Sequence, residues 1–135
     1  MKKNIQNNIS KFETNGYVVS DVESYDSLKL ISNFFKNNFS SKFSKVKKID
    51  HDLNKIHNFV KPKSLNEFRI NLFNKFNDND KLKKSYFNLA TNLIENIVGN
   101  ELAMQKRINI SIQLPNDKSS LLPLHSDTWS GDSPF

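Results

Sequence analysis

The chain has 135 residues, with 20 Lys and Arg against 14 Asp and Glu, which gives a formal charge of +6. This length suits one domain. The absence of Cys excludes disulfides, thiolate metal sites and a Cys nucleophile, and three Gly are too few for a glycine-rich phosphate loop. No apolar run approaches the ~20 residues of a membrane helix, and no apolar segment follows Lys2 and Lys3 as in a signal peptide. We therefore expect a cytoplasmic protein with no membrane contact.

The basic surplus is less informative than its size suggests. All the basic residues except Arg69 and Arg107 are Lys, and they are dispersed along the chain. Arg is the preferred residue for bidentate contacts to phosphates and bases. The sequence therefore favours a solvated, Lys-rich surface over a nucleic-acid-binding one.

In the first 60 residues we expect mainly helices. A short helix at 5–12 is followed by Gly16, and the β-branched and aromatic residues at 16–20 indicate a short strand. Either Ser24 or Asp26 can cap the next helix. Its apolar residues recur at helical spacing: Leu28, Ile31, Phe34 and Phe35. Residues 40–63 are less regular, with a helical turn or two near 53–60.

Two further helices are predicted before residue 100. The sequence Ser64-Leu65-Asn66-Glu67 has the form of a capping box, and it opens a helix with Phe68, Leu72, Phe73 and Phe76 on one face. Asp80 is expected to cap the last helix, and Gly99 to end it. The last helix carries an unbroken apolar stripe, interpreted as core: Tyr86, Leu89, Ala90, Leu93, Ile94, Ile97 and Val98.

The pattern changes at Glu101. Apolar Ile108, Ile110, Ile112 and Leu114 alternate with polar Arg107, Asn109, Ser111 and Gln113. A period of two predicts a half-buried strand with one polar face. A turn at 115–117 and a second strand at 119–124 then lead into His125-Ser126-Asp127.

His125 and Asp127 form the most specific chemical pattern in the chain. In an extended segment, residues i and i+2 project to the same side, so an imidazole and a carboxylate can take adjacent positions on a divalent metal. This is the local part of a 2-His-1-carboxylate facial triad. By spacing alone, a solvated loop histidine is the more common explanation of such a pair.

Two stretches resemble the iron(II)- and 2-oxoglutarate-dependent oxygenases, in particular the phytanoyl-CoA-dioxygenase-like branch. The stretch FETNGYVV at 12–19 is similar to the opening of that branch. The stretch ELAMQKRINISIQLPNDKSSLLPLHSDTWSGDSPF at 101–135 is similar to the strand pair that leads to its H-x-D motif. The amino-acid sequence of the second stretch resembles that of oxygenases encoded in sporadic bacterial gene clusters for surface carbohydrates. Residues 20–100 match only as generic helices.

The resemblance implies an α+β fold within one domain. Residues 1–100 would form a mainly helical N-terminal layer packed on residues 101–135, the first strands of a double-stranded β-helix (jelly-roll, cupin-like) barrel. His125 and Asp127 would be the first two ligands of Fe(II), with 2-oxoglutarate as cofactor and dioxygen as co-substrate. The substrate would be a carbohydrate-related or other small metabolite that is hydroxylated or oxidised.

The same resemblance assigns further residues to the site. If the polar face of the alternating strand faces the barrel interior, Asn109, Ser111 or Gln113, joined by Gln105, would hydrogen-bond 2-oxoglutarate or substrate. If that face points outward, these side chains only meet water. Trp129 would wall the pocket or a sugar ring, or else simply pack beside the motif.

The chain also departs from the family pattern. No second His and no Arg or Lys follow Asp127, and we interpret His51 and His57 as surface residues. Residues 101–135 are fewer than the ~40 that eight strands need before any turns. We therefore expect an N-terminal fragment that is inactive alone, of open oligomeric state. The alternatives are a small basic helical module that binds nucleic acid or protein, and a metal-dependent cupin of another reaction type.

Overall fold

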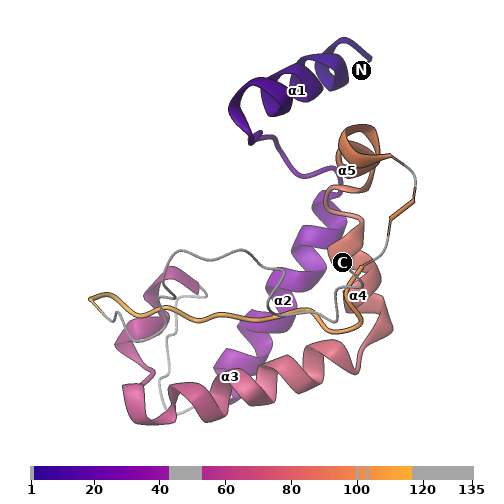
Figure 1. Ribbon diagram of the computed structural model, residues 1–135. Helices are drawn as coiled ribbons and strands as arrows, with labels where there is room; N and C mark the ends of the chain where they lie inside the picture. Colours follow the sequence, from indigo (N-terminus) through magenta and orange to yellow (C-terminus); the bar gives the residue numbers. More distant parts are fainter. Residues whose placement is uncertain (1, 43–52, 100, 103, 117–135) are drawn as a thin grey trace, which may run out of the picture.

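The computed structural model describes residues 2–42, 53–99, 101–102 and 104–116. Helices form most of this part of the chain (Figure 1). In chain order the elements are α1 (Lys2–Asn15), α2 (Tyr25–Lys42), the short 3-10 helix η1 (Leu53–Asn58), α3 (Pro62–Asn77), α4 (Asp80–Phe87) and α5 (Thr91–Val98). The residues of the predicted second strand, of the H-x-D motif and of Trp129 lie outside the described part.

Several helix ends follow from local sequence. The Oγ atom of Ser24 accepts a hydrogen bond from the backbone N–H of Ser27 (3.2 Å), so Ser24 rather than Asp26 caps α2. α1 ends at Gly16 and α5 at Gly99, both with positive φ (77° and 91°), a conformation that glycine adopts without steric cost.

Three local predictions are wrong. The Ser64 capping box is not used, because α3 already begins at Pro62, and the hydroxyl of Ser64 donates to the carbonyl of Lys61 instead (3.1 Å). Asn79 rather than Asp80 caps α4, with its Oδ1 accepting from the N–H of Leu82 (3.1 Å). The last helix is interrupted at residues 88–90, so its apolar stripe is divided between α4 and α5.

The core lies where α2, α3, α4 and the segment 104–116 meet, and phenylalanine dominates it. One buried cluster consists of Phe39, Val60, Phe68 and Leu72, and the other of Phe76, Leu82 and Ile108. The Phe76 ring lies 5.5 Å from that of Phe34 (edge to face) and 5.8 Å from that of Phe35 (stacked). These are favourable geometries for aromatic pairs. Phe68, Leu72 and Phe76 of the predicted apolar face of α3 are thus confirmed as core, whereas Phe73 is only half-buried.

The segment 104–116 runs across the helices as an extended chain (Figure 1). Its alternation has the predicted sense: Ile108 is buried and Ile110 and Ile112 are half-buried, whereas the polar residues between them are exposed. Ile110 packs against both core clusters. The segment ends in a turn at Pro115–Asn116, where Asn116 has a φ of 61°.

The predicted α+β fold with a jelly-roll barrel is wrong, because the described residues contain no strand and no sheet. Residues 16–20, expected as a strand, form an irregular connection between α1 and α2. Residues 107–114 are extended, but their apolar side chains pack on helices and not on a second sheet. A period of two reports that one face of an extended chain is buried; it does not specify what covers that face.

Candidate functional site

The four predicted cofactor-binding residues lie on the extended segment and are all exposed. Asn109, Ser111 and Gln113 share the side of the segment that faces away from the helices, and Gln105 precedes them. The structure therefore brings three of the four into one polar row. His125, Asp127 and Trp129, which the resemblance placed beside this row, lie outside the described residues.

The backbone that carries this row is fixed by one buried side chain. Asn77, at the end of α3, is 7% exposed. Its Oδ1 accepts from the N–H of Ile108 (2.7 Å), and its Nδ2 donates to the carbonyl of Ile108 (3.0 Å) and of Phe73 (2.8 Å). The amide thus makes with Ile108 both hydrogen bonds that a neighbouring strand would make.

An apolar cavity of about 280 Å³, partly open to the surface, lies beside the segment. Phe39 of α2 with Phe68 and Leu72 of α3, all buried, contribute the most enclosed part of its lining. Leu53 and Ile56 of η1 line one side, and residues 110–113 of the extended segment line another. Ser111 and Gln113, two members of the polar row, are the polar residues in this lining.

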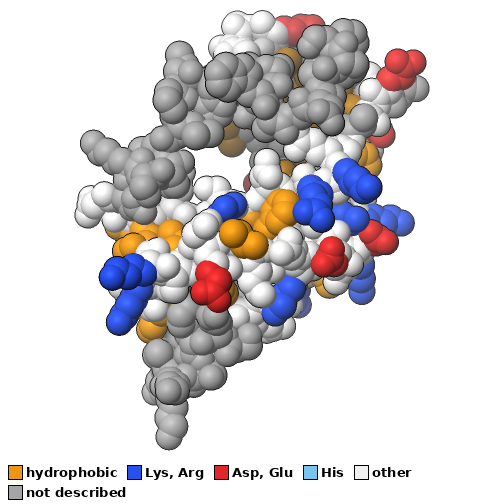
Figure 2. All heavy atoms as spheres, turned by 60° about the horizontal axis from the view of Figure 1, so that its bottom comes forward, with side chains coloured by type: hydrophobic (Ala, Val, Ile, Leu, Met, Phe, Trp, Pro, Cys, Tyr) orange, Lys and Arg blue, Asp and Glu red, His pale blue; other side chains and the backbone are white. Residues whose placement is uncertain are grey.

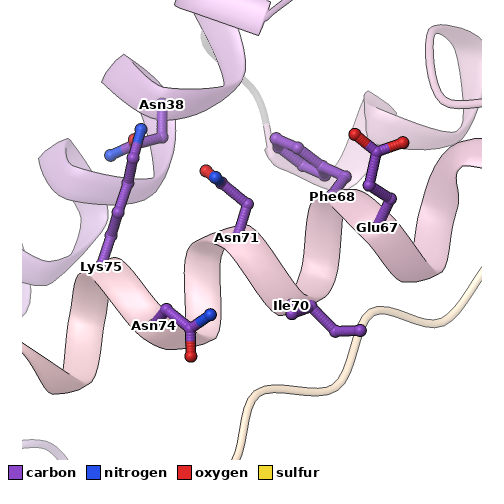
Figure 3. Close-up of a pocket in the computed structure, with 7 residues that line it drawn as sticks. All are labelled: Asn38, Glu67, Phe68, Ile70, Asn71, Asn74 and Lys75. Atoms are coloured by element: carbon purple, nitrogen blue, oxygen red, sulfur yellow. The ribbon is translucent and has the colours of Figure 1, made fainter.

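A second, more polar cavity of about 470 Å³ lies along α3 on the side of α2 (Figure 3). Asn38, Asn71 and Asn74 contribute amides to its lining, and Lys75 and Glu67 contribute charges. Figure 3 shows Lys75 extending toward Asn38, and its Nζ donates to Asn38 Oδ1 (3.0 Å). The lining thus offers amide groups that can donate and accept hydrogen bonds.

The described titratable residues do not assemble a metal site. Among residues 2–42, 53–99, 101–102 and 104–116 no group of three potential ligands comes together. His57 is exposed on η1, as predicted, while His51 lies outside the described part. Arg69 donates to Asn66 Oδ1 (2.9 Å), and the guanidinium carbon of Arg107 lies 5.5 Å from the ring centroid of Phe73. Both arginines thus contact residues of α3 at its surface.

Charge on the described surface is mixed. Figure 2 shows Lys and Arg side chains interspersed with Asp and Glu over the face that contains α3. On α4, Lys83 Nζ pairs with Asp80 Oδ1 at 2.8 Å, and the hydrogen bond and the positive charge of Lys83 lower the pKa of the Asp80 carboxyl. This distribution gives no support to the alternative of a nucleic-acid-binding module.

None of the helices in the described part is long and apolar enough to cross a membrane. Comparison with known proteins identifies no relative: no family model, no curated protein and no solved structure matches the chain. The functional argument therefore rests on the residues of this chain alone.

Two residues that organise the described part were missed by sequence reasoning. Asn77 is the last residue of α3. Its position four residues after Phe73 was the only sequence feature that indicated burial of its side chain. Glu23 accepts from the N–H and Nδ2 of Asn92 (3.0 and 2.8 Å) and from the N–H of Leu93 (2.7 Å), which caps α5. No local sequence pattern predicts this cap, because Glu23 lies far from Asn92 and Leu93 in the sequence.

Proposed function

We propose that this chain contributes the first two metal ligands, His125 and Asp127, of an iron(II)- and 2-oxoglutarate-dependent oxygenase. The observation that supports the proposal is the H-x-D spacing of the sequence, which can place an imidazole and a carboxylate on one side of an extended segment. Asn109, Ser111 and Gln113 precede this motif in the order that the resemblance implies, although all three are exposed in the described part. The substrate would be a carbohydrate-related or other small metabolite.

The described residues offer only part of what such a site needs. The hydroxyl of Ser111 and the amides of Asn109 and Gln113 can donate hydrogen bonds to carboxylate or hydroxyl oxygens. They do not supply a positive charge to pair with the 2-oxoglutarate carboxylate, and Arg107, the nearest arginine in sequence, lies over Phe73. The described part thus does not fit the complete cofactor, and we derive no catalytic step through it.

Metal binding by the 135-residue chain tests the proposal. We expect Fe(II), titrated under anaerobic conditions, to bind the wild-type chain and to bind His125→Ala and Asp127→Ala at least about tenfold more weakly, because each variant loses a direct ligand. His57→Ala is the matched control, since His57 is exposed on η1. Equal binding by all four proteins would contradict the proposed ligands.

The cofactor is tested in the same titration. 2-Oxoglutarate chelates a metal through its keto and carboxylate oxygens, so its presence should tighten Fe(II) binding to the wild-type chain. Glutarate has the same two carboxylates without the keto group, and it should have no such effect. Identical behaviour with the two compounds would exclude 2-oxoglutarate as the co-ligand.

A further inference from the structure

The extended segment 107–114 has one backbone edge without a partner among the described residues. In an extended chain, the N–H and C=O groups of one residue point to one edge, and those of the next residue point to the other. Ile108 directs both groups to Asn77 of α3 (2.7 and 3.0 Å). The opposite edge is formed by the backbone of Asn109, Ser111 and Gln113. Within the described part of the chain, no hydrogen bond reaches the backbone of these three residues.

The two faces of the segment restrict what can pair with this edge. Ile110 and Ile112 pack on the helices, whereas the three polar residues between and beside them are exposed. A strand that extends both faces must alternate apolar and polar residues in the same way. Residues 107–114 of a second copy of this chain have that alternation. Strand edges with unpaired N–H and C=O groups accept a further strand through main-chain hydrogen bonds.

One antiparallel register pairs the segment with itself. When Ser111 lies opposite Ser111 of the second copy, Asn109 lies opposite Gln113, and each of these residues exchanges both backbone hydrogen bonds with its counterpart. On the helix side, Ile110 lies opposite Ile112. Hydroxyl and β-branched pairs of this kind stabilise neighbouring strands.

The ends of the segment agree with this register. Arg107 lies opposite Pro115, which has no N–H to donate, so the hydrogen-bonded ladder ends there. The backbone then turns at Asn116, which has a φ of 61°. A parallel pair in register would instead place Arg107 beside Arg107 of the second copy, and like charges directly opposite each other are destabilising. The sequence therefore favours the antiparallel pair.

We propose that residues 109–113 form a homodimer interface, in which the segments of two copies pair as antiparallel strands about a two-fold axis at Ser111. The contact uses backbone groups and leaves the polar side chains on the exposed face. It does not depend on the proposed iron site. The iron titration and a measurement of dimerisation can therefore fail separately.

Sedimentation velocity of the 135-residue chain tests the association. The wild type should convert from monomer to dimer as its concentration rises. Ser111→Lys and Ser111→Glu each place like charges opposite each other at the axis, and each should raise the concentration at half-dimerisation about two- to fivefold. An equimolar mixture of these two variants should dimerise at least as readily as the wild type, because opposite charges then face each other.

Asn74→Lys, at an exposed position of α3, is the matched control, since it adds the same charge away from the edge. It should dimerise as the wild type does. A wild type that stays monomeric at every concentration would overturn the proposal. So would an equal loss of dimer in Asn74→Lys and Ser111→Lys, because the effect would then come from net charge.

Introduced cysteines test the register, since the chain has no Cys of its own. Ser111→Cys should form a disulfide-linked dimer under mild oxidation, because the Cα atoms of a hydrogen-bonded antiparallel pair lie ~5.5 Å apart, within the range of disulfides. Gln113→Cys is the control: its two copies would lie ~13 Å apart and should cross-link only at the rate of random collision. A mixture of Asn109→Cys and Gln113→Cys should cross-link readily. Equal cross-linking by Ser111→Cys and Gln113→Cys alone would overturn the two-fold axis at Ser111.

Discussion

The helical core and the α1–α5 end use similar amphipathic helices with different outcomes. In the core, α3 contributes Phe68, Leu72 and Phe76, each no more than 3% exposed. α5 has an equally clear apolar stripe, yet it buries no residue, and Val98 remains 62% exposed. It packs mainly against α1, a largely polar helix. An amphipathic pattern becomes core only where several apolar faces meet, because a single partner helix cannot enclose the stripe.

The means of attachment differ as well. The core is held by packed rings and the buried amide of Asn77, whereas α5 is attached through exposed hydrogen bonds that its first residues donate to the Glu23 carboxylate. The backbone N–H of Glu23 also donates to the carbonyl of Leu89 (2.9 Å). Such contacts permit local opening at low free energy, while the core opens only with global unfolding.

The largest expected effect breaks the core. Phe76→Ala should lower the free energy of unfolding by about 3–5 kcal/mol, since it leaves a cavity beside Phe34 and Phe35. Phe12→Ala on α1, where Phe12 is 37% exposed, should cost below about 1 kcal/mol. Urea unfolding measures both, and Phe76→Leu serves as a milder substitute if the alanine variant does not fold. Similar losses of unfolding free energy at the two positions would contradict the difference between the core and the α1–α5 end.

The next effect separates the extended segment from the helices. Asn77→Ala leaves the N–H and carbonyl of Ile108 without their partner, at about 1–3 kcal/mol for each group that stays buried. Hydrogen exchange of the Ile108 amide should accelerate by the same free energy. Asn74→Ala, at an exposed position of the same helix, should stay within about 0.5 kcal/mol of the wild type. Unchanged protection at Ile108 would show that Asn77 does not hold the segment.

A smaller effect concerns the attachment of α5. Glu23→Ala removes the cap and should destabilise α5 by about 0.5–2 kcal/mol, the range for helix N-caps. Faster exchange of the Leu93 amide is the expected readout, with little change at Leu72 in the core. Glu95→Ala, exposed on α5 itself, controls for loss of charge. An equal change at Leu72 would indicate that the two regions unfold together.

The smallest effect belongs to α4, which connects the two regions. Because Lys83 lowers the folded-state pKa of Asp80, this carboxylate stabilises α4 above its unfolded pKa, and the stabilisation is lost as pH falls through the lower folded value. An NMR titration of the Asp80 carboxyl should give a higher midpoint in Lys83→Gln than in the wild type. The same midpoint in both proteins would exclude the pairing.

Local predictions succeeded where the cause was local. The end of α5 at Gly99 follows from the conformational freedom of glycine, and the buried face of α3 follows from the spacing of its phenylalanines. The first helix was predicted only over 5–12, whereas α1 continues to Asn15 and ends before Gly16. The Ser64 box failed because a helix start at Pro62 leaves Ser64 inside the first turn. Pro is favoured at the first helical position, so two starting signals competed within three residues.

The candidate site also combines features that the local sequence predicts with one that it does not. The alternation at 107–114 predicts which side chains are buried and which form the polar row, and the structure has that arrangement. The apolar cavity could not be predicted, because η1, α2, α3 and the extended segment, which are distant in sequence, together form its lining. Whether His125 and Asp127 bind iron remains a prediction for the titration to decide.

The sequence by itself determined the mainly helical character of the described residues 2–42 and 53–99, the spacing of the core phenylalanines and the two faces of residues 107–114, since these depend on neighbours along the chain. Only the tertiary structure decided that the extended segment lies on helices instead of in a sheet, and that α5 stays exposed. Backbone hydrogen bonds can be satisfied by any suitable partner, and for Ile108 that partner is the side chain of Asn77. That choice depends on which elements meet in space, which no local pattern encodes.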